Sequence, residues 1–395
     1  MYFKTKKKVE CTGCTACLNS CPRKCIKMHQ DNEGFLYPVI DKDKCVECGL
    51  CEKVCPVKNP VFNSQNIPKV YAAYVNDIQE RQKSSSGGVF YVIAKWVLEH
   101  GGIVFGSTID NHNQVYHCAV ERTEDLSILR GSKYVQSDLR NVFLEVKEAL
   151  KLNRYCYFVG TPCQVAGLKA YLRKDYAYLL TSDLVCHGVP SQWIFDQHIS
   201  FLERKYNGEI HNYRFRDNKA WRGCEIFEVE RHNGSHRTII NPTYNLSPYL
   251  YSFMYGMISR YSCYDCKFAI IPRQGDITLA DYWGAERLFA DIESKSGVSL
   301  VLCNTTKGEE ILNKIKDSVR LIKSSVEDAS RFNANLIHTS DKHPIRDIVY
   351  EEIRNKGYKK VAETVFRSTD YYKLKLLHTL LNTTAWKLVR PLFKR

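Results

Sequence analysis

The sequence lacks the long apolar run that a membrane-spanning helix requires. Such a helix needs about 20 consecutive apolar residues, and the longest candidate, Tyr249 to Ile258, is shorter and rich in tyrosine. The first residues, MYFKTKKKVECTG, also contain no apolar stretch of the kind found in a secretory signal. We therefore expect no transmembrane segment and a cytoplasmic location.

Nucleic-acid-binding motifs are also missing, although the formal net charge of the 395 residues is +14. A basic surface can meet nucleic acid, an anionic membrane or an acidic protein. The basic residues between Lys4 and Lys8 stand beside no nucleic-acid motif and are typical of a solvated chain end. We predict no nucleic-acid partner and favour an acidic protein.

Cysteine, by contrast, is abundant, with 17 residues. In a small secreted chain this would indicate disulfides, but in a long chain without an export signal it favours metal binding. Eight of the cysteines form two copies of the pattern C-x2-C-x2-C-x3-C-P, namely Cys11, Cys14, Cys17 and Cys21 before Pro22, and Cys45, Cys48, Cys51 and Cys55 before Pro56. This pattern is that of bacterial two-cluster ferredoxins.

The spacing of these cysteines has a physical reason. Two-residue gaps let three thiolates from one tight loop face the same 4Fe-4S cluster, whereas the fourth points into the partner cluster. The predicted ligands are Cys11, Cys14, Cys17 and Cys55 for cluster 1, and Cys45, Cys48, Cys51 and Cys21 for cluster 2. Zinc is the alternative, but zinc sites typically use two C-x2-C pairs rather than two quartets ending in Cys-Pro. Cys25 lies outside the pattern and is expected to be a buried apolar side chain.

The rest of the chain alternates strand and helix patterns, which predicts a sheet covered by helices. Strands are expected at 69–75, 102–109, 115–120, 154–160 and 176–186, and helices at 88–100, 138–151, from about 163, and at 191–206. Residues 209–240 alternate as antiparallel strands do, and the chain beyond 340 has a helical pattern. No internal repeat is visible beyond the duplicated cysteine motif.

These patterns predict a chain of mixed α+β and α/β class in three parts. A ferredoxin-like domain for two 4Fe-4S clusters is expected at 1–60, followed by a polar linker with two prolines at 58–68. A larger α/β domain follows at 68–350, with parts at about 68–150 and 151–350. A basic, mostly helical tail occupies 351–395.

Four further cysteines lie where functional groups often lie. Cys163 is in a strand-to-helix turn, Cys186 ends a strand, and Cys263 and Cys266 form a C-x2-C pair. Strand ends gather at one edge of an open sheet, so four thiolates there could hold a third cluster. Zinc on the same cysteines and a nucleophilic Cys163 with His187 as its base are the alternatives. The apolar segments around Cys118, Cys156, Cys224 and Cys303 predict core positions.

The same region carries a resemblance to a known family. The segments GTPCQ (160–164), CHGVP (186–190), CYDC (263–266) and GDITLADYWG (275–284) resemble the family of beta subunits of coenzyme F420-reducing hydrogenases and dehydrogenases. The resemblance extends from about residue 68 to 350. It implies a flavoprotein that uses FAD with iron–sulfur clusters, in which Cys163, Cys186, Cys263 and Cys266 hold one 4Fe-4S cluster near the flavin.

The flavin contacts are harder to find from the residues alone. No G-x-G-x-x-G follows the first expected strand, so a Rossmann dinucleotide site is not supported. The segment Ser84, Ser85, Ser86, Gly87 and Gly88 precedes a helix, where it either cradles a pyrophosphate or provides an ordinary serine N-cap. The resemblance favours the first and suggests further contacts at Ser132, Lys133, Tyr134, Thr161 and Gln164. Asp281 and Trp283 are expected to shape the same site.

The chemistry of the two cofactor types suggests why they occur together. A hydride carries two electrons and a cluster accepts one, and FAD can exchange both. We expect an FAD-dependent iron–sulfur oxidoreductase acting on a small organic molecule, with an electron-carrier protein or partner oxidoreductase. The alternatives are a non-catalytic subunit that feeds a partner enzyme and, third, a cysteine-nucleophile transferase. The basic C-terminal helix, with Leu374, Leu377, Leu381 and Leu388, either contacts a partner or membrane surface or packs on its own domain.

Overall fold

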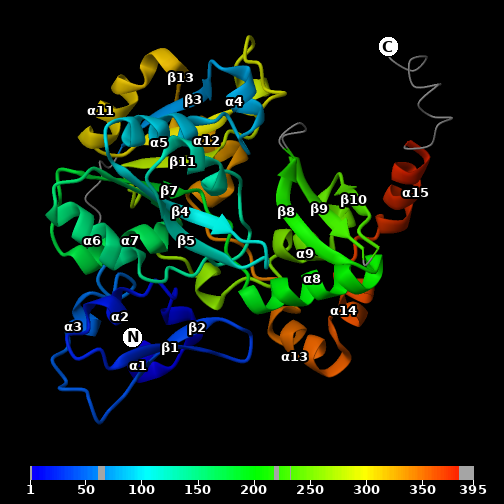
Figure 1. Ribbon diagram of the computed structural model, residues 1–395, viewed down its shortest axis with the longest axis horizontal. Coiled ribbons are helices and arrows are strands. Elements are labelled where there is room, and N and C mark those ends of the chain that lie inside the picture. Colours follow the sequence, from blue (N-terminus) through cyan, green and yellow to red (C-terminus); the bar gives the residue numbers. More distant parts are fainter. Residues whose placement is uncertain (1, 61–66, 218–221, 232, 382–395) are drawn as a thin grey trace.

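The computed structural model describes residues 2–60, 67–217, 222–231 and 233–381. Its N-terminal module is built on one antiparallel hairpin (Figure 1), formed by β1 (Ile26–Gln30) and β2 (Leu36–Ile40). Short helical turns carry the cysteine loops: α1 (Tyr2–Thr5), η1 (Lys8–Glu10), α2 (Ala16–Ser20) and α3 (Leu50–Lys53). The expected ferredoxin-like module is therefore present.

The larger part is built on a mixed sheet of eight strands in the order β13-β3-β12-β11-β7-β6-β4-β5. The neighbours β11, β7, β6 and β4 run parallel, and the outer strands pair antiparallel. The strands are β3 (Lys69–Val75), β4 (Ile103–Ile109), β5 (Val115–Val120), β6 (Cys156–Gly160), β7 (Leu179–Leu184), β11 (Ile277–Asp281), β12 (Ser299–Cys303) and β13 (Val319–Ser324). The central strands are covered on both faces, and β6 is accordingly a near-continuous apolar run. The neighbouring strand β7 instead buries the polar residues Thr181, Ser182 and Asp183.

Helices cover both faces of this sheet. In β6, Tyr157 points to a core with α5 (Val89–Glu99) and α11 (Thr306–Lys314), whereas Phe158 points to one with α6 (Val142–Lys151) and α7 (Pro162–Leu172). This alternation is the period of two expected of a strand. The remaining elements of this part are α4 (Ile78–Gln82), η2 (Thr123–Leu129), α10 (Ala285–Leu288), η5 (Lys316–Ser318), α12 (Val326–Phe332) and η6 (Ala334–Leu336).

A second, three-stranded sheet lies beside the first, facing the end to which the arrow of β4 points in Figure 1. It consists of β8 (Glu209–Asp217), β9 (Arg222–Glu230) and β10 (His236–Asn241). Its core includes residues from α8 and α14 and also receives Phe35 and Tyr37 of the N-terminal module. The helical elements here are α8 (Gln192–Tyr206), η3 (Tyr244–Leu246), α9 (Pro248–Met254), η4 (Tyr261–Cys263), α13 (Arg346–Lys356), α14 (Tyr358–Thr364) and α15 (Tyr371–Leu381).

The structure confirms the strands and helices expected up to residue 240 and the helical C-terminal region. The sequence analysis did not identify β11, β12 and β13, whose partners lie far away in the chain, as β12 pairs with β3. No helix of the described residues is long and apolar enough to cross a membrane. Leu388 and the linker residues 61–66 lie outside the described residues.

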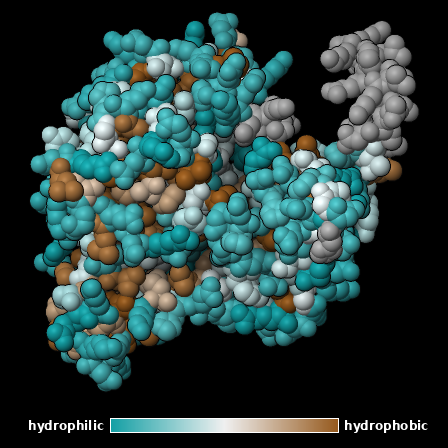
Figure 2. All heavy atoms as spheres, in the orientation of Figure 1, coloured by the Kyte–Doolittle hydropathy of each residue, from teal (hydrophilic) through white to brown (hydrophobic). Residues whose placement is uncertain are grey.

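The surface differs between the two halves of the molecule in the view of Figure 2. Hydrophobic residues gather where Figure 1 places α6, α7 and the N-terminal module, and the face over β8–β10 is mainly hydrophilic. On α6, Leu144 is exposed, and Leu152 directly after this helix is exposed as well. The N-terminal module therefore adjoins a surface with more apolar character than the second sheet presents.

Candidate functional site

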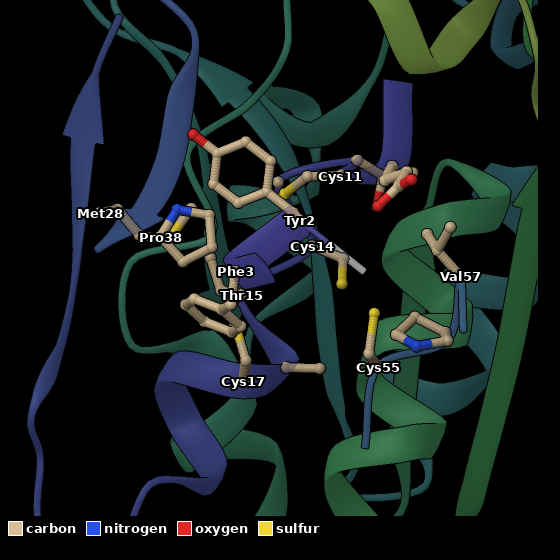
Figure 3. A pocket seen from close by; sticks show the side chains of 15 residues that line it. Tyr2, Phe3, Cys11, Cys14, Thr15, Cys17, Met28, Pro38, Cys55 and Val57 are labelled. Atoms are coloured by element: carbon tan, nitrogen blue, oxygen red, sulfur yellow. The ribbon is translucent and has the colours of Figure 1, made fainter. Parts of the chain in front are cut away.

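The cysteines predicted for cluster 1 surround one cavity in the N-terminal module. Cys11 and Cys14 come from the loop before α2, Cys17 lies on α2, and Cys55 follows α3. All four line the same pocket, and Figure 3 shows Cys14 and Cys55 approaching it from different segments. Gly13, with φ +72°, supplies a left-handed turn in this loop. The two cysteine motifs therefore meet in space as their spacing predicts.

The chemistry of this cavity fits an iron–sulfur cluster. Burial raises the pKa of Cys14 to about 12, and repulsion from Cys11 and Cys55 adds to the rise. Burial also raises the pKa of Cys17. Such thiols ionise together only beside a strong positive centre, which a bound metal supplies. The four thiols that line this cavity are the donor set that a 4Fe-4S cluster uses.

The cysteines predicted for cluster 2 gather on the other side of the module. Burial raises the pKa of Cys51, with smaller contributions from Cys45 and Cys48, so these three thiols are neighbours. Cys21 joins them through Cys25, since the two Sγ atoms are 3.4 Å apart and Cys25 is within hydrogen-bonding reach of Cys45. Cys25 is buried as expected, but no sequence pattern indicated that it would adjoin the cluster thiols. Cys48 is exposed.

The four cysteines outside the module converge where the parallel strands end. Strands β6 and β7 are adjacent, and Gly160 pairs with Asp183. Cys163 in the first turn of α7 and Cys186 just after β7 therefore leave the sheet side by side. Cys263 ends η4 and Cys266 follows it, on a loop held to the segment after Cys186. That contact is a hydrogen bond from the Arg260 N–H to the Val189 carbonyl at 3.0 Å.

Electrostatics shows how closely these four thiols lie together. Burial raises the pKa of Cys163 to about 11 and that of Cys263 to about 12, and it also raises the pKa values of Cys186 and Cys266. Within the set, every pair of thiols interacts as like charges. Only neighbours do so in a folded protein. The arrangement fits a cluster bound at this edge of the sheet.

Single metal ions require a different geometry. Among residues 2–60, 67–217, 222–231 and 233–381, no group of three or more His, Cys, Asp or Glu side chains closes around a point that could hold one ion. A cubane cluster instead holds its four thiolates apart, around a body of iron and sulfide.

The raised pKa of Cys163 bears on its alternative role as a nucleophile. A reactive thiol has a lowered pKa, whereas burial and then the neighbouring Cys266 raise that of Cys163. Its near neighbour is the Thr161 hydroxyl, at 3.2 Å from Sγ. Desolvation of the ring lowers the pKa of His187, with opposing effects of Asp281 and Arg216. Without a bound metal, this environment does not favour a thiolate at Cys163.

Helix α7 joins the third cysteine set to the first. Cys163 lies in its first turn, and Gly167 faces Cys14 one turn later. A Cβ at Gly167 would be 2.8 Å from Cys14 Cβ and 3.1 Å from its Sγ. Cys163 of the third set is therefore about one helical turn from Gly167, which itself contacts Cys14 of the first set.

Arg260 lies buried between the same two sets. Its Nε donates to the Cys11 carbonyl at 2.8 Å, and its Nη2 donates to the Leu36 carbonyl at 2.9 Å. Its positive charge opposes the rise that burial causes in the pKa of Cys163 and Cys263. No sequence pattern indicates a role for this residue apart from its position three residues before Cys263.

The two segments predicted to contact a flavin lie side by side. The Ser85 hydroxyl accepts a hydrogen bond from the Ser132 N–H at 3.0 Å. The expectation of an ordinary serine N-cap is wrong, because Gly88, with φ +87°, is the N-cap of α5 and no side chain caps this helix. Gly87 packs so tightly on the sheet that a Cβ would meet the Ala73 carbonyl oxygen at 2.3 Å. The flanking hydroxyls, those of Ser84 and Ser86, bond to the Glu80 and Val298 carbonyls.

Lys133 and Tyr134 border this pair of segments. Lys133 Nζ donates to the carbonyls of Ser107 at 2.8 Å and Arg130 at 2.9 Å, and burial lowers its pKa to about 7. Within the described part of the chain, these bonds go to carbonyls rather than to a carboxylate. The Tyr134 ring stacks on Phe253, with centroids 5.1 Å apart.

Thr161 and Gln164 form the capping box of α7. Gln164 Oε1 accepts from the Thr161 N–H at 2.9 Å, and its Nε2 donates to Ser137 Oγ at 3.0 Å. Two orphan N–H groups at the helix start are satisfied in this way. The box fixes the turn that carries Cys163, and contact of either side chain with a flavin stays a prediction.

Comparison with known proteins agrees with these observations. Residues 153–329 match the C-terminal region of the family described as "Coenzyme F420 hydrogenase/dehydrogenase, beta subunit", and residues 10–59 match a "4Fe-4S dicluster domain". The first range contains all four cysteines of the third set, and the second contains both motifs of the N-terminal module.

Individual relatives match separate parts of the chain. A ferredoxin from Saccharopolyspora erythraea is 41% identical over 59 residues, which are 15% of this chain and 50% of the ferredoxin. A subunit of the F(420)H(2) dehydrogenase of Methanosarcina mazei is 27% identical over 165 residues, which are 39% of this chain and 46% of that subunit. The chain thus spans about half the length of these curated relatives.

One solved structure is similar in its fold. A chain of the F420-reducing [NiFe] hydrogenase complex from Methanosarcina barkeri is 19% identical, with a TM-score of 0.43. The match covers 77% of this chain and 95% of that chain. A likeness this distant carries no argument about residues, cofactors or partners.

Proposed function

Because the chain belongs to the family of coenzyme F420 hydrogenase/dehydrogenase beta subunits and carries a 4Fe-4S dicluster domain, we propose that it is an FAD-dependent iron–sulfur oxidoreductase. It would transfer electrons between an acidic electron-carrier protein and a small organic hydride donor or acceptor, in the cytoplasm. FAD, when bound, supplies the exchange between two-electron and one-electron chemistry. A third 4Fe-4S cluster on Cys163, Cys186, Cys263 and Cys266 is part of the proposal.

The contact between α7 and the N-terminal module supports this function most directly. The helix begins at the third cysteine set and reaches Cys14 of the first set at Gly167. A module that only stored electrons would not need its cluster ligand to lie in close contact with a helix of the large domain. The contact instead gives a short route between the ferredoxin-like module and the edge of the large sheet.

The chain's own residues would position the flavin at that edge. The Ser84–Gly88 segment and Ser132 to Tyr134 lie together through the Ser85 bond, and the start of α5 leaves backbone N–H groups free of side-chain caps. A helix N-terminus favours phosphate by its N–H groups and its dipole. Lys133, whose Nζ donates to backbone carbonyls, follows Ser132 directly and so borders the same place. These features support the flavin proposal.

The experiment is cofactor analysis of anaerobically purified full-length protein. Acid extraction should release FAD, identified by chromatography and fluorescence. Gly87→Leu should lower the FAD content without lowering the iron of the N-terminal module, because the added side chain meets the backbone of Ala73. Gly106→Ala is a control, because its φ is not positive and an added Cβ there meets no atom nearer than 3.4 Å. Protein with full iron content and no flavin would refute the proposed function.

A non-catalytic subunit is the second candidate, and the exposure of Cys48 favours it. A cluster ligand at the surface lets a partner approach that cluster closely. The helix α15 also exposes Leu376 and Leu377. The M. mazei relative is itself named as a subunit. This candidate predicts that anaerobically purified protein oxidises and reduces no small molecule on its own and gains activity only with an added partner.

A further inference from the structure

Arg216 is a buried cation, and part of its guanidinium has no hydrogen-bond acceptor among the described residues. It lies on β8 and is 5% exposed. Its Nη1 lies 2.5 Å from Asp281 Oδ2 and 3.4 Å from the Tyr134 hydroxyl. Its Nε and Nη2 are buried and have no hydrogen-bond partner among the described residues. A guanidinium normally has five N–H donors in a planar fork, and here one side of the fork is unpaired within that part of the chain.

An irregularity in the pairing of β8 with β9 turns the Arg216 side chain inward. In a strand, successive side chains point to opposite faces, and Tyr213 is buried and Arg214 exposed as this period requires. Phe215 and Arg216 are then both buried, and the pairing of β8 with β9 shifts register between Arg214 and Arg216. A bulge of this kind re-aims a side chain and is frequent next to functional sites.

The surroundings of Arg216 belong to the candidate functional site. Asp281 ends β11, the strand parallel to β7, and β7 leads to Cys186. The Arg216 guanidinium is 5.5 Å from the Trp283 ring centre. His187, next to Cys186, experiences the charges of both Asp281 and Arg216. Tyr134 belongs to the segment predicted to contact the flavin.

We propose that Arg216 binds an oxyanion, a carboxylate or a phosphate, through its Nε and Nη2, with Asp281 as the positioning residue on Nη1. Arginine binds both groups through two parallel N–H bonds. A buried, unpaired charged donor is costly, so the fork is completed when such a ligand is present. The oxyanion belongs either to the substrate or to the FAD pyrophosphate. The placement beside the flavin rests on the proposed function.

Inorganic phosphate serves as the probe in the first experiment. The thermal unfolding midpoint of the iron-loaded full chain, freed of any bound flavin, is measured against phosphate concentration at constant ionic strength. The parent should be stabilised by phosphate, Arg216→Gln should lose at least tenfold in apparent affinity, and Arg216→Lys should be intermediate. Arg214→Gln, exposed on the same strand, should behave as the parent. If Arg216→Gln unfolds because Asp281 loses the neighbouring positive charge, the double variant Arg216→Gln with Asp281→Asn removes both charges and is measured instead of the single variant.

A second arm distinguishes the two sources of the oxyanion. FAD affinity is measured by fluorescence titration of the same variants. A parallel loss of FAD affinity assigns the oxyanion to the FAD pyrophosphate, and unchanged FAD affinity assigns it to the substrate. Protein that binds no FAD but responds to phosphate through Arg216 would refute the proposed function and support this inference. An equal phosphate response in parent and Arg216→Gln overturns the inference, as does no response in the parent.

Discussion

Arg260 shows how one buried side chain can serve two cysteine sets. It is 1% exposed, yet its guanidinium has polar partners on several elements, including the Gln136 side chain at 3.1 Å. It also lies 4.1 Å from the ring centre of Tyr37. A fixed positive charge stabilises the more negative, reduced form of a nearby cluster, which raises its reduction potential. We therefore expect Arg260 to raise the reduction potential of the clusters proposed at these sites, in addition to its packing role.

Replacing Arg260 should make the nearby clusters harder to reduce. Arg260→Met should lower their midpoint potentials by about 60 mV, which corresponds to ~1.4 kcal/mol for one electron. Arg260→Lys keeps the charge and should retain most of the parent potential. The measurement is an anaerobic redox titration followed by electron paramagnetic resonance. Arg237→Met, exposed on β10, is the matched control, and equal potentials in Arg260→Met and the parent would contradict this role.

The helix α7 is the element on which the connection between the sites depends. Its capping box fixes the first turn, and Gly167 brings its side to the backbone of Cys14, whose carbonyl oxygen would be 3.0 Å from an added Cβ. A cluster ligand and a helix this close leave no room for a larger residue. The helix thus sets the spacing between the N-terminal module and the large sheet.

Gly167→Ala should loosen this contact. Overpacking of a tight interface costs about 1–3 kcal/mol, so the thermal midpoint should fall. Electrons should also pass more slowly from the N-terminal module to the proposed flavin. Stopped-flow absorbance under anaerobic conditions measures the second effect. Gly106→Ala is the control, because its added Cβ meets no atom nearer than 3.4 Å. Equal stability and rates in the two variants would show that α7 is not a close-packed link.

Helices and strands could be predicted from the sequence when the signals for them lie within the element itself. The helix α5 and the hairpin of β4 and β5 were predictable because periodicity and turn residues lie within the segment. The strands β12 and β13 were not, since β3, from early in the chain, lies between them and supplies their pairing. Short apolar runs do not reveal such distant partners. The same limit hid Arg216, whose inward orientation depends on a bulge.

At the scale of the whole molecule, the N-terminal module is tied to the C-terminal helices by a buried ion pair. Arg346 of α13 donates to Glu33, with Nη1–Oε1 and Nη2–Oε2 distances of 3.0 and 2.8 Å. Both residues are buried, and Arg346 Nε also donates to the Ser259 carbonyl at 2.8 Å. The pair joins residues 313 positions apart. No pattern in the sequence indicates such a pairing, whereas the cysteine spacing predicted the cluster sites from one short segment.

Breaking this pair should destabilise the molecule strongly. Arg346→Met leaves the buried Glu33 carboxylate with only the Lys8 ammonium, whose Nζ lies 3.8 Å from Oε2. Breaking a buried pair costs about 3–5 kcal/mol, and anaerobic urea unfolding measures the loss. Adding Glu33→Gln to Arg346→Met should recover part of it, because no buried charge remains. Lys342→Met removes an exposed pair with Asp347 and should cost at most about 1 kcal/mol. A cost for Arg346→Met no larger than this would contradict the described role.

The central claim concerns three cysteine sets that act together, and iron content tests it most directly. Three 4Fe-4S clusters require about 12 iron atoms per chain, and two require about 8. Anaerobically reconstituted parent protein should give the higher value, and Cys163→Ser should fall toward the lower one. Cys303→Ser, at a buried position on β12, should leave iron unchanged. A parent value near eight, unaltered by Cys163→Ser, would contradict the account.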